Sequence, residues 1–121
     1  MKKILLIEPD AFYADIIQDR LQDEGWDVLH APSGEQGLRD AEAERPHVIL
    51  LAIKLSRTDG FEVLDLLKQT RATARIPVIM LTELGSKEDI DHCYGIGCAG
   101  YVIKAHHQPE DLIAQIREQI G

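Results

Sequence analysis

The sequence Val48-Ile49-Leu50-Leu51-Ala52-Ile53 decides the fold class of this 121-residue chain. Six apolar residues in a row, without polar alternation, are typical of a strand that is covered on both faces, as the strands of parallel sheets are. The turn residues Thr58-Asp59-Gly60 follow, and apolar residues then recur at helical spacing at Val63, Leu64 and Leu67. The stretch therefore predicts a buried strand, a turn and a helix.

The same alternation of strand and helix extends to both sides of this unit. Apolar runs predict further strands over 4–7, 27–31, 77–82 and 100–104. Capping and helix-breaking residues predict helices from Asp10 to Gly25, from Ser33 through about Glu44, from Ser86 to the glycines at 95 and 97, and from Pro109 onward. Five such units predict one domain, residues 1–121, with an α/β, flavodoxin-like (βα)5 fold: a doubly wound parallel sheet of strand order 2-1-3-4-5.

Three of the helices carry apolar residues at helical spacing, which we expect to face the core. These residues are Phe12, Ile16, Ile17 and Leu21 in the first helix, Ile90, Cys93 and Tyr94 in the fourth, and Leu112, Ile113, Ile116 and Ile120 in the last. Cys93 and Cys98 follow a C-x-x-x-x-C spacing, which predicts reduced, partly buried thiols rather than a metal or redox site.

The composition is acidic, and this limits the classes of partner. Lys and Arg number 13 against 21 Asp and Glu, which gives a formal charge of −8. Nucleic-acid phosphates are bound by clustered Lys and Arg, so no direct contact with nucleic acid is expected. No apolar stretch of about 18 residues is present, and the first apolar run ends at Glu8, too early for a signal peptide. We expect a cytoplasmic protein that does not bind membranes. The adjacent His106 and His107 lack an evident third ligand and are not expected to bind zinc.

The predicted topology also places the functional site. In open parallel sheets, ligands bind outside the carboxyl ends of the strands, at the point where the strand order reverses. The candidate site residues are therefore those at or just after the predicted strand ends. They are Glu8, Pro9, Asp10, Ala52, Lys54, Thr82 and Lys104.

Four stretches of the chain carry a family resemblance. They are ILLIEPD at 4–10, PHVILLAIKLSRTDGFEVL at 46–64, IPVIMLT at 76–82 and AGYVIKA at 99–105. In this order and at these spacings, the chain resembles the response-regulator receiver family, of the chemotaxis-regulator-like kind, over its whole length. The resemblance implies a receiver domain of two-component, or phosphorelay, signal transduction.

The resemblance also implies a set of pocket residues, and this chain departs from it. The family has a phosphoacceptor Asp at the end of the third strand, where Ala52 stands here. It has two acidic residues after the first strand that help to hold Mg²⁺; Glu8 matches the first, but Pro9 replaces the second. Thr82 matches the family's hydroxyl position and Lys104 its lysine, whereas Ala105 stands where the family usually has Pro.

These departures remove chemistry that aspartyl phosphorylation requires. A methyl group cannot attack phosphorus, so Ala52 removes the usual acceptor. Mg²⁺ binds through carboxylates and waters, and only Glu8 and Asp10 remain, so we expect no cofactor and at most weak residual Mg²⁺ binding. Asp10 is expected to be a helix N-cap and Asp59 a turn residue, and neither is expected to accept the phosphoryl group in its place.

The remaining polar residues of the pocket have their own expected partners. We predict that Lys104 pairs with Glu8, because a buried ammonium needs a counter-charge or water. Lys54 either leans over the space left by Ala52 or, as we favour, is a solvated loop side chain. Thr82 either takes part in the site or is a strand-end hydroxyl that bonds to the backbone.

Tyr101 is the candidate for an interaction surface. By resemblance it takes the family's switch aromatic position, on the face formed by the fourth helix, the fifth strand and the fifth helix. The alternative is a half-buried strand aromatic with a solvated hydroxyl.

Three functions compete. The first is a pseudo-receiver: a non-enzymatic, phosphorylation-independent protein-interaction module, monomeric or weakly dimeric, whose partner is a histidine kinase or a signalling or output protein. The second is a conventional receiver whose natural residue 52 is Asp and was replaced by Ala; Pro9 weighs against it, because it damages the metal site independently. The third, a flavodoxin-like enzyme or cofactor binder, lacks a Gly-rich phosphate loop, since Glu8-Pro9-Asp10 stands after the first strand.

Overall fold

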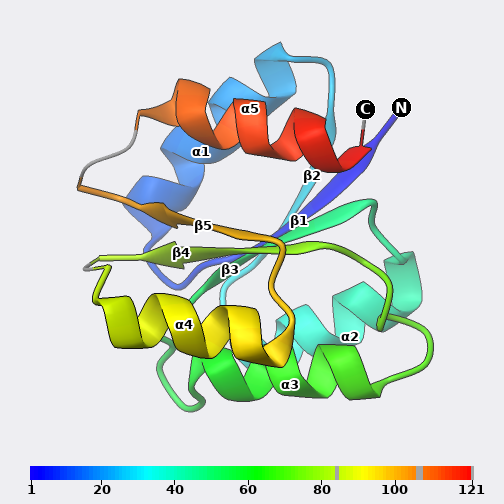
Figure 1. Ribbon diagram of the computed structural model, residues 1–121. Helices are drawn as coiled ribbons and strands as arrows, with labels where there is room; N and C mark the ends of the chain where they lie inside the picture. The colour runs from blue at the N-terminus through cyan, green and yellow to red at the C-terminus, as the bar shows by residue number, and fades with distance from the viewer. Residues whose placement is uncertain (84, 106–107, 121) are drawn as a thin grey trace.

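The computed structural model describes residues 1–83, 85–105 and 108–120. These residues form five strands and five helices in strict alternation (Figure 1). The strands are β1 (Lys3–Ile7), β2 (Asp27–Ala31), β3 (Val48–Ala52), β4 (Val78–Thr82) and β5 (Gly100–Ile103). The helices are α1 (Ala11–Asp23), α2 (Gly34–Glu44), α3 (Gly60–Gln69), α4 (Lys87–Ile96) and α5 (Pro109–Ile120). All strand pairings are parallel, and the order β2-β1-β3-β4-β5 confirms the predicted flavodoxin-like topology.

The sheet is covered on both faces. Figure 1 shows α1 and α5 on one side and α2, α3 and α4 on the other. β3 contributes to both cores: Val48 and Leu50 belong to the cluster with α1 and α5, while Ile49 and Leu51 belong to the opposite cluster. An uninterrupted apolar strand is therefore required here, because neither face of β3 is open to water.

Several element boundaries differ from those predicted. β3 ends at Ala52, so Ile53 already belongs to the following loop. α3 begins at Gly60, inside the predicted turn, because Asp59 acts as its N-cap rather than as a turn residue. α4 continues through Gly95 and ends before Gly97, whose φ of 127° favours glycine.

Three residues predicted to face the core are instead exposed. Phe12 and Ile16 on α1 have relative exposures of 78% and 43%, and Tyr94 on α4 has 48%. α1 instead buries Ala14, Ile17 and Leu21, and α4 buries only Cys93 completely. The apolar stripe of each helix is thus narrower than the sequence pattern, so the spacing rule included residues at its edges.

The two cysteines lie together at the end of α4. Cys93 and Cys98 are both buried free thiols, and the Cys98 backbone N–H donates to the Cys93 carbonyl at 2.9 Å. Burial raises the pKa of both thiols. None of the helices in the described part of the chain combines the length and the apolar composition of a membrane span.

Candidate functional site

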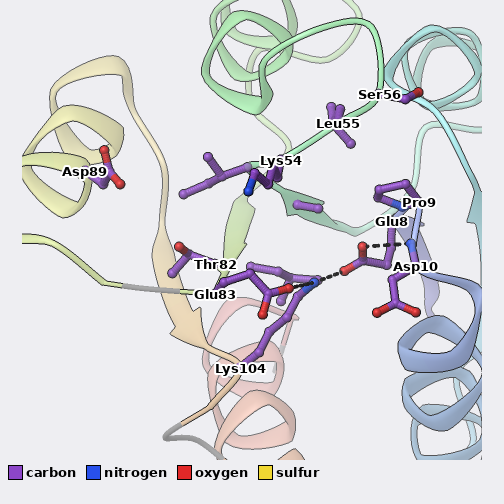
Figure 2. A pocket seen from close by; sticks show the side chains of 13 residues that line it. Glu8, Pro9, Asp10, Lys54, Leu55, Ser56, Thr82, Glu83, Asp89 and Lys104 are labelled. Carbon is purple, nitrogen blue, oxygen red and sulfur yellow. Dashed lines mark hydrogen bonds and ion pairs between the residues drawn. The ribbon is translucent and has the colours of Figure 1, made fainter.

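A cleft of about 530 Å³ opens where the carboxyl ends of β1, β3, β4 and β5 meet (Figure 2). All of the strand-end candidates line it: Glu8, Pro9, Asp10, Ala52, Lys54, Thr82 and Lys104. The remaining described lining residues are Ile53, Leu55, Ser56, Leu81, Glu83 and Asp89. The parallel topology alone therefore predicted where these side chains gather.

Glu8 and Lys104 form the central ion pair of the cleft. Lys104 Nζ lies 2.5 Å from Glu8 Oε1, and the two side chains are 10% and 1% exposed. Glu8 Oε2 accepts a hydrogen bond from the Asp10 backbone N–H at 3.2 Å. The pair predicted from the sequence is confirmed, and the buried carboxylate has a cation on one oxygen and a backbone donor on the other.

Lys104 has two further neighbours that the sequence analysis missed. Its Nζ lies 3.3 Å from Glu83 Oε1 and 4.5 Å from the centre of the Tyr13 ring. Burial, together with the charges of Glu8 and Glu83, raises the pKa of Tyr13 to about 12. Glu83 directly follows the predicted site residue Thr82, and Tyr13 lies three residues, about one helical turn, after Asp10.

The end of β3 places a methyl group in the cleft. Ala52 is 2% exposed and is the last residue of the strand. Gly60 packs directly against this strand end: its N–H donates to the Ile53 carbonyl at 2.8 Å, and a Cβ on Gly60 would collide with the Ala52 carbonyl oxygen. Lys54 is exposed, as favoured from the sequence, and pairs through its backbone with Asp59.

Two carboxylates near the cleft are engaged by helix ends. Asp10 Oδ1 accepts from the backbone N–H groups of Phe12 and Tyr13 at 3.1 and 3.2 Å, which confirms it as the N-cap of α1. Asp59 Oδ1 accepts from the Phe61 N–H at 2.8 Å. These bonds fix both carboxylates to backbone amides.

The comparisons with known proteins identify the family. A family model described as the response regulator receiver domain matches residues 4–117. This chain belongs to the response regulator receiver family. It is therefore a receiver domain of two-component signalling, and the family is not one of classical enzymes.

Curated relatives of this receiver are transcriptional regulators. The chain is 34% identical, over 97% of its length, to the DNA-binding dual master transcriptional regulator RpaA of Synechocystis sp., of which the match covers 48%. It is 32% identical, over 96% of its length, to the alkaline phosphatase synthesis transcriptional regulatory protein PhoP of Bacillus subtilis, of which the match covers 47%. The receiver thus spans about half the length of these relatives.

Solved receiver structures have the same fold. A CheY-like receiver domain protein from Methanospirillum hungatei superposes with a TM-score of 0.91 at 29% identity, covering 99% of this chain and 94% of that one. The receiver domain of the sensor histidine kinase PA1611 from Pseudomonas aeruginosa superposes with a TM-score of 0.90 at 27% identity, covering 99% and 98%. That structure contains a magnesium ion coordinated in the active site cleft.

Two positions of this cleft lack the carboxylate that the family resemblance implies. Pro9 and Ala52 offer no side-chain oxygen, and one oxygen of Glu8 already faces Lys104. Within residues 1–83, 85–105 and 108–120, no three or more His, Cys, Asp or Glu side chains are grouped to hold a metal. His106 and His107 lie outside the described residues.

Tyr101 lies on β5 and is not among the described residues that line the cleft. Its ring is half-buried against the core beside α3 and α4 and meets the Tyr94 ring edge-on, with centres 6.1 Å apart. The Tyr101 carbonyl accepts a hydrogen bond from Gln115 Nε2 of α5 at 2.9 Å. The residue therefore connects β5 to both α4 and α5, the three elements that the family resemblance names as one face.

Proposed function

We propose that residues 1–121 act as a single receiver domain that signals without phosphorylation, as a non-enzymatic protein-interaction module. The observation that carries this proposal is the buried methyl group of Ala52 at the end of β3, where the family resemblance implies a phosphoacceptor carboxylate. A carbon without a lone pair cannot attack a phosphoryl group. Asp10 and Asp59, the nearest alternatives in sequence, are held by helix N-termini.

The state of the metal site supports the same proposal. Phosphoryl transfer depends on Mg²⁺ to neutralise the transferring oxygens. With Pro9 and Ala52 in place of two carboxylates, Glu8 and Asp10 are left as the acidic residues of the implied metal site, so we expect weak Mg²⁺ binding. Lys104 is moreover already neutralised by Glu8 and Glu83.

The partner in this proposal is a protein, a histidine kinase or a signalling or output protein. Its contact surface would be the face around Tyr101 and α5. A formal charge of −8 argues against direct nucleic-acid contact by this chain, although the relative RpaA is described as DNA-binding. We further propose a cytoplasmic location and a monomeric or weakly dimeric state.

A second candidate is a conventional phospho-accepting receiver whose natural residue 52 is Asp. The presence of both Thr82 and Lys104 at the cleft favours it, since these residues match the family positions that would contact a phosphoryl group. Pro9 counts against it, because restoring position 52 leaves the second metal-site carboxylate missing.

Intact mass after incubation with Mg²⁺ and acetyl phosphate separates these candidates. The test uses the unaltered chain and the Ala52→Asp variant, with an Ala114→Asp variant on the exposed side of α5 as a control for added surface carboxylates. Our proposal expects no phosphate on the unaltered chain. Phosphate on Ala52→Asp alone would favour the second candidate. Phosphate on the unaltered chain would refute the proposal and reveal another acceptor.

A further inference from the structure

The cleft beside Ala52 has the dimensions and wall chemistry of a small-molecule site. Its volume of about 530 Å³ falls within the usual range of ligand pockets. Five described lining residues are apolar, and a few polar groups stand among them, as in most such pockets. The apolar residues are Pro9, Ala52, Ile53, Leu55 and Leu81.

The charges of the cleft select the kind of ligand. Its described lining residues include four carboxylates and two ammonium groups. The carboxylates are those of Glu8, Asp10, Glu83 and Asp89. Lys104 is already paired with Glu8 and Glu83, and Lys54 is exposed, so its ammonium can turn into water. An anion entering the cleft would thus meet excess negative charge, whereas a cation would be attracted.

Asp89 is the carboxylate best placed to meet an added cation. It lies in the first turn of α4, across the cleft from Glu8 and Asp10 (Figure 2). Ser86 Oγ bonds to the Asp89 backbone N–H at 3.1 Å, and the Asp89 carboxylate itself has no ion pair or hydrogen bond to a described residue. Ala52 and Leu81 contribute apolar surface to the same cleft.

We propose that the cleft binds a small organic cation, a primary amine on a compact apolar body. The apolar body packs against Pro9, Ala52 and Leu81, and the ammonium is attracted to Asp89. This ligand supplies the input that phosphorylation supplies elsewhere, so the inference rests on the proposed function. The same methyl group that removes the phosphoacceptor forms part of the ligand's apolar wall.

Three probes of similar size and different charge test the inference: phenethylamine, 2-phenylethanol and phenylacetate. Each is titrated into the chain and followed by ¹H–¹⁵N NMR. Phenethylamine is expected to give saturable shifts centred on Ala52, Leu81 and Asp89, with a roughly millimolar Kd for a ligand of this size. Phenylacetate should bind at least roughly tenfold more weakly because of the excess of carboxylates.

Matched pairs of variants test whether phenethylamine binds in the cleft. Ala52→Met fills the cleft and should weaken phenethylamine binding at least tenfold (about 1.4 kcal/mol), whereas Ala114→Met on the exposed side of α5 should not. Asp89→Asn should weaken binding of the amine but not of the alcohol. Glu88→Gln, which removes a charge from the same helical turn, should leave both unchanged. The Asp89→Asn comparison still decides the matter if Ala52→Met does not fold.

Several results would overturn the inference: no saturable shift with phenethylamine, equal or tighter binding of phenylacetate, or unchanged binding in Asp89→Asn. Failure of the proposed function is seen separately, because it requires phosphate on the unaltered chain by intact mass. A chain that takes no phosphate and binds no amine refutes the ligand alone.

Discussion

At the scale of single residues, the cleft is organised around the charge of Lys104. The Lys104 side chain is 10% exposed, and its ammonium pairs with Glu8, whose side chain is 1% exposed. Removing one member of a buried ion pair leaves the other without compensation, and this is more costly than breaking an exposed pair. The pair therefore fixes the carboxyl ends of β1 and β5 relative to one another.

Glu8→Gln should lower the free energy of unfolding by about 1–3 kcal/mol, because Lys104 loses its buried counter-charge but keeps Glu83 and some access to water. Urea unfolding measures this change. Glu44→Gln, which breaks the more exposed pair between Lys3 and Glu44, serves as the matched control and should have little effect. Equal losses in the two variants would mean that Glu8 does not stabilise Lys104.

The phenol of Tyr13 should make the stability of the folded state depend on pH in the alkaline range. Its pKa is raised to about 12 by burial and by Glu8 and Glu83, against an ordinary value of 10.0. Below pH 10 both the folded and the unfolded forms keep the proton, so the stability is unaffected. As the pH rises from about 10 to 12, the unfolded form loses the proton first, and the folded state is destabilised.

Urea midpoints measured from pH 8 to about 11.5 should therefore fall more steeply for the unaltered chain than for Tyr13→Phe. The difference between the two curves isolates Tyr13 from the lysines, which titrate in both proteins. Parallel curves would show that the Tyr13 phenol ionises equally easily in the folded and unfolded states.

The cleft contains residues that the sequence predicted and residues that it did not. Glu8, Ala52, Thr82 and Lys104 were predicted because parallel strand ends meet at one edge of the sheet, whatever their side chains do. Glu83 and Asp89 were missed because their place in the cleft depends on the path of the connection after β4 and on the orientation of α4. Such details are set by tertiary packing and leave no periodic signal in the sequence.

At the scale of elements, the strands were predictable because their apolar runs are continuous, and the helix limits were less so. α3 begins at Gly60 rather than near Val63 because the Asp59 cap, not the first apolar residue, starts the helix. Phe12 and Tyr94 have apolar side chains at helical spacing, yet they lie outside the buried stripes. Periodicity indicates the direction of a face but not its width.

The junction of β3 and α3 depends on a glycine. Gly60→Ala should lower the free energy of unfolding by about 1–3 kcal/mol, because the new Cβ collides with the Ala52 carbonyl oxygen and the backbone of Ile53. Gly95→Ala is the matched control, since this helical glycine has nothing within 4 Å of its Cβ position. There the same change should stabilise the protein by about 0.5–1 kcal/mol through helix propensity. Urea unfolding of both variants should therefore give effects of opposite sign.

For the molecule as a whole, the fold is that of the family, although two side chains that line the cleft differ from those that the family resemblance implies. A response regulator receiver fold is formed with Ala52 and Pro9 in place, and it superposes with a TM-score of 0.90 on a receiver with magnesium in its cleft. The two core clusters are built from apolar residues on both sheet faces, and neither cluster contains Pro9 or Ala52. Pro9 and Ala52 line the cleft instead, so changes at these two positions are expected to alter the site more than the two core clusters.

Mg²⁺ should consequently have almost no effect on the thermal stability of this chain. A ligand that binds only the folded state stabilises it by RT ln(1 + [L]/Kd), so about 5 mM Mg²⁺ with a Kd near 10 mM adds only about 0.2 kcal/mol. That corresponds to a rise in Tm of roughly 1 °C for a domain of this size. The double variant Pro9→Asp/Ala52→Asp restores two carboxylates, and a Kd near 1 mM would add about 1 kcal/mol at the same concentration. Thermal unfolding of both proteins, with NaCl at matched ionic strength as the control, measures the difference. A saturable rise in the unaltered chain as large as that of the double variant would show that Glu8 and Asp10 suffice to hold the metal, and that Lys104 gives way to it.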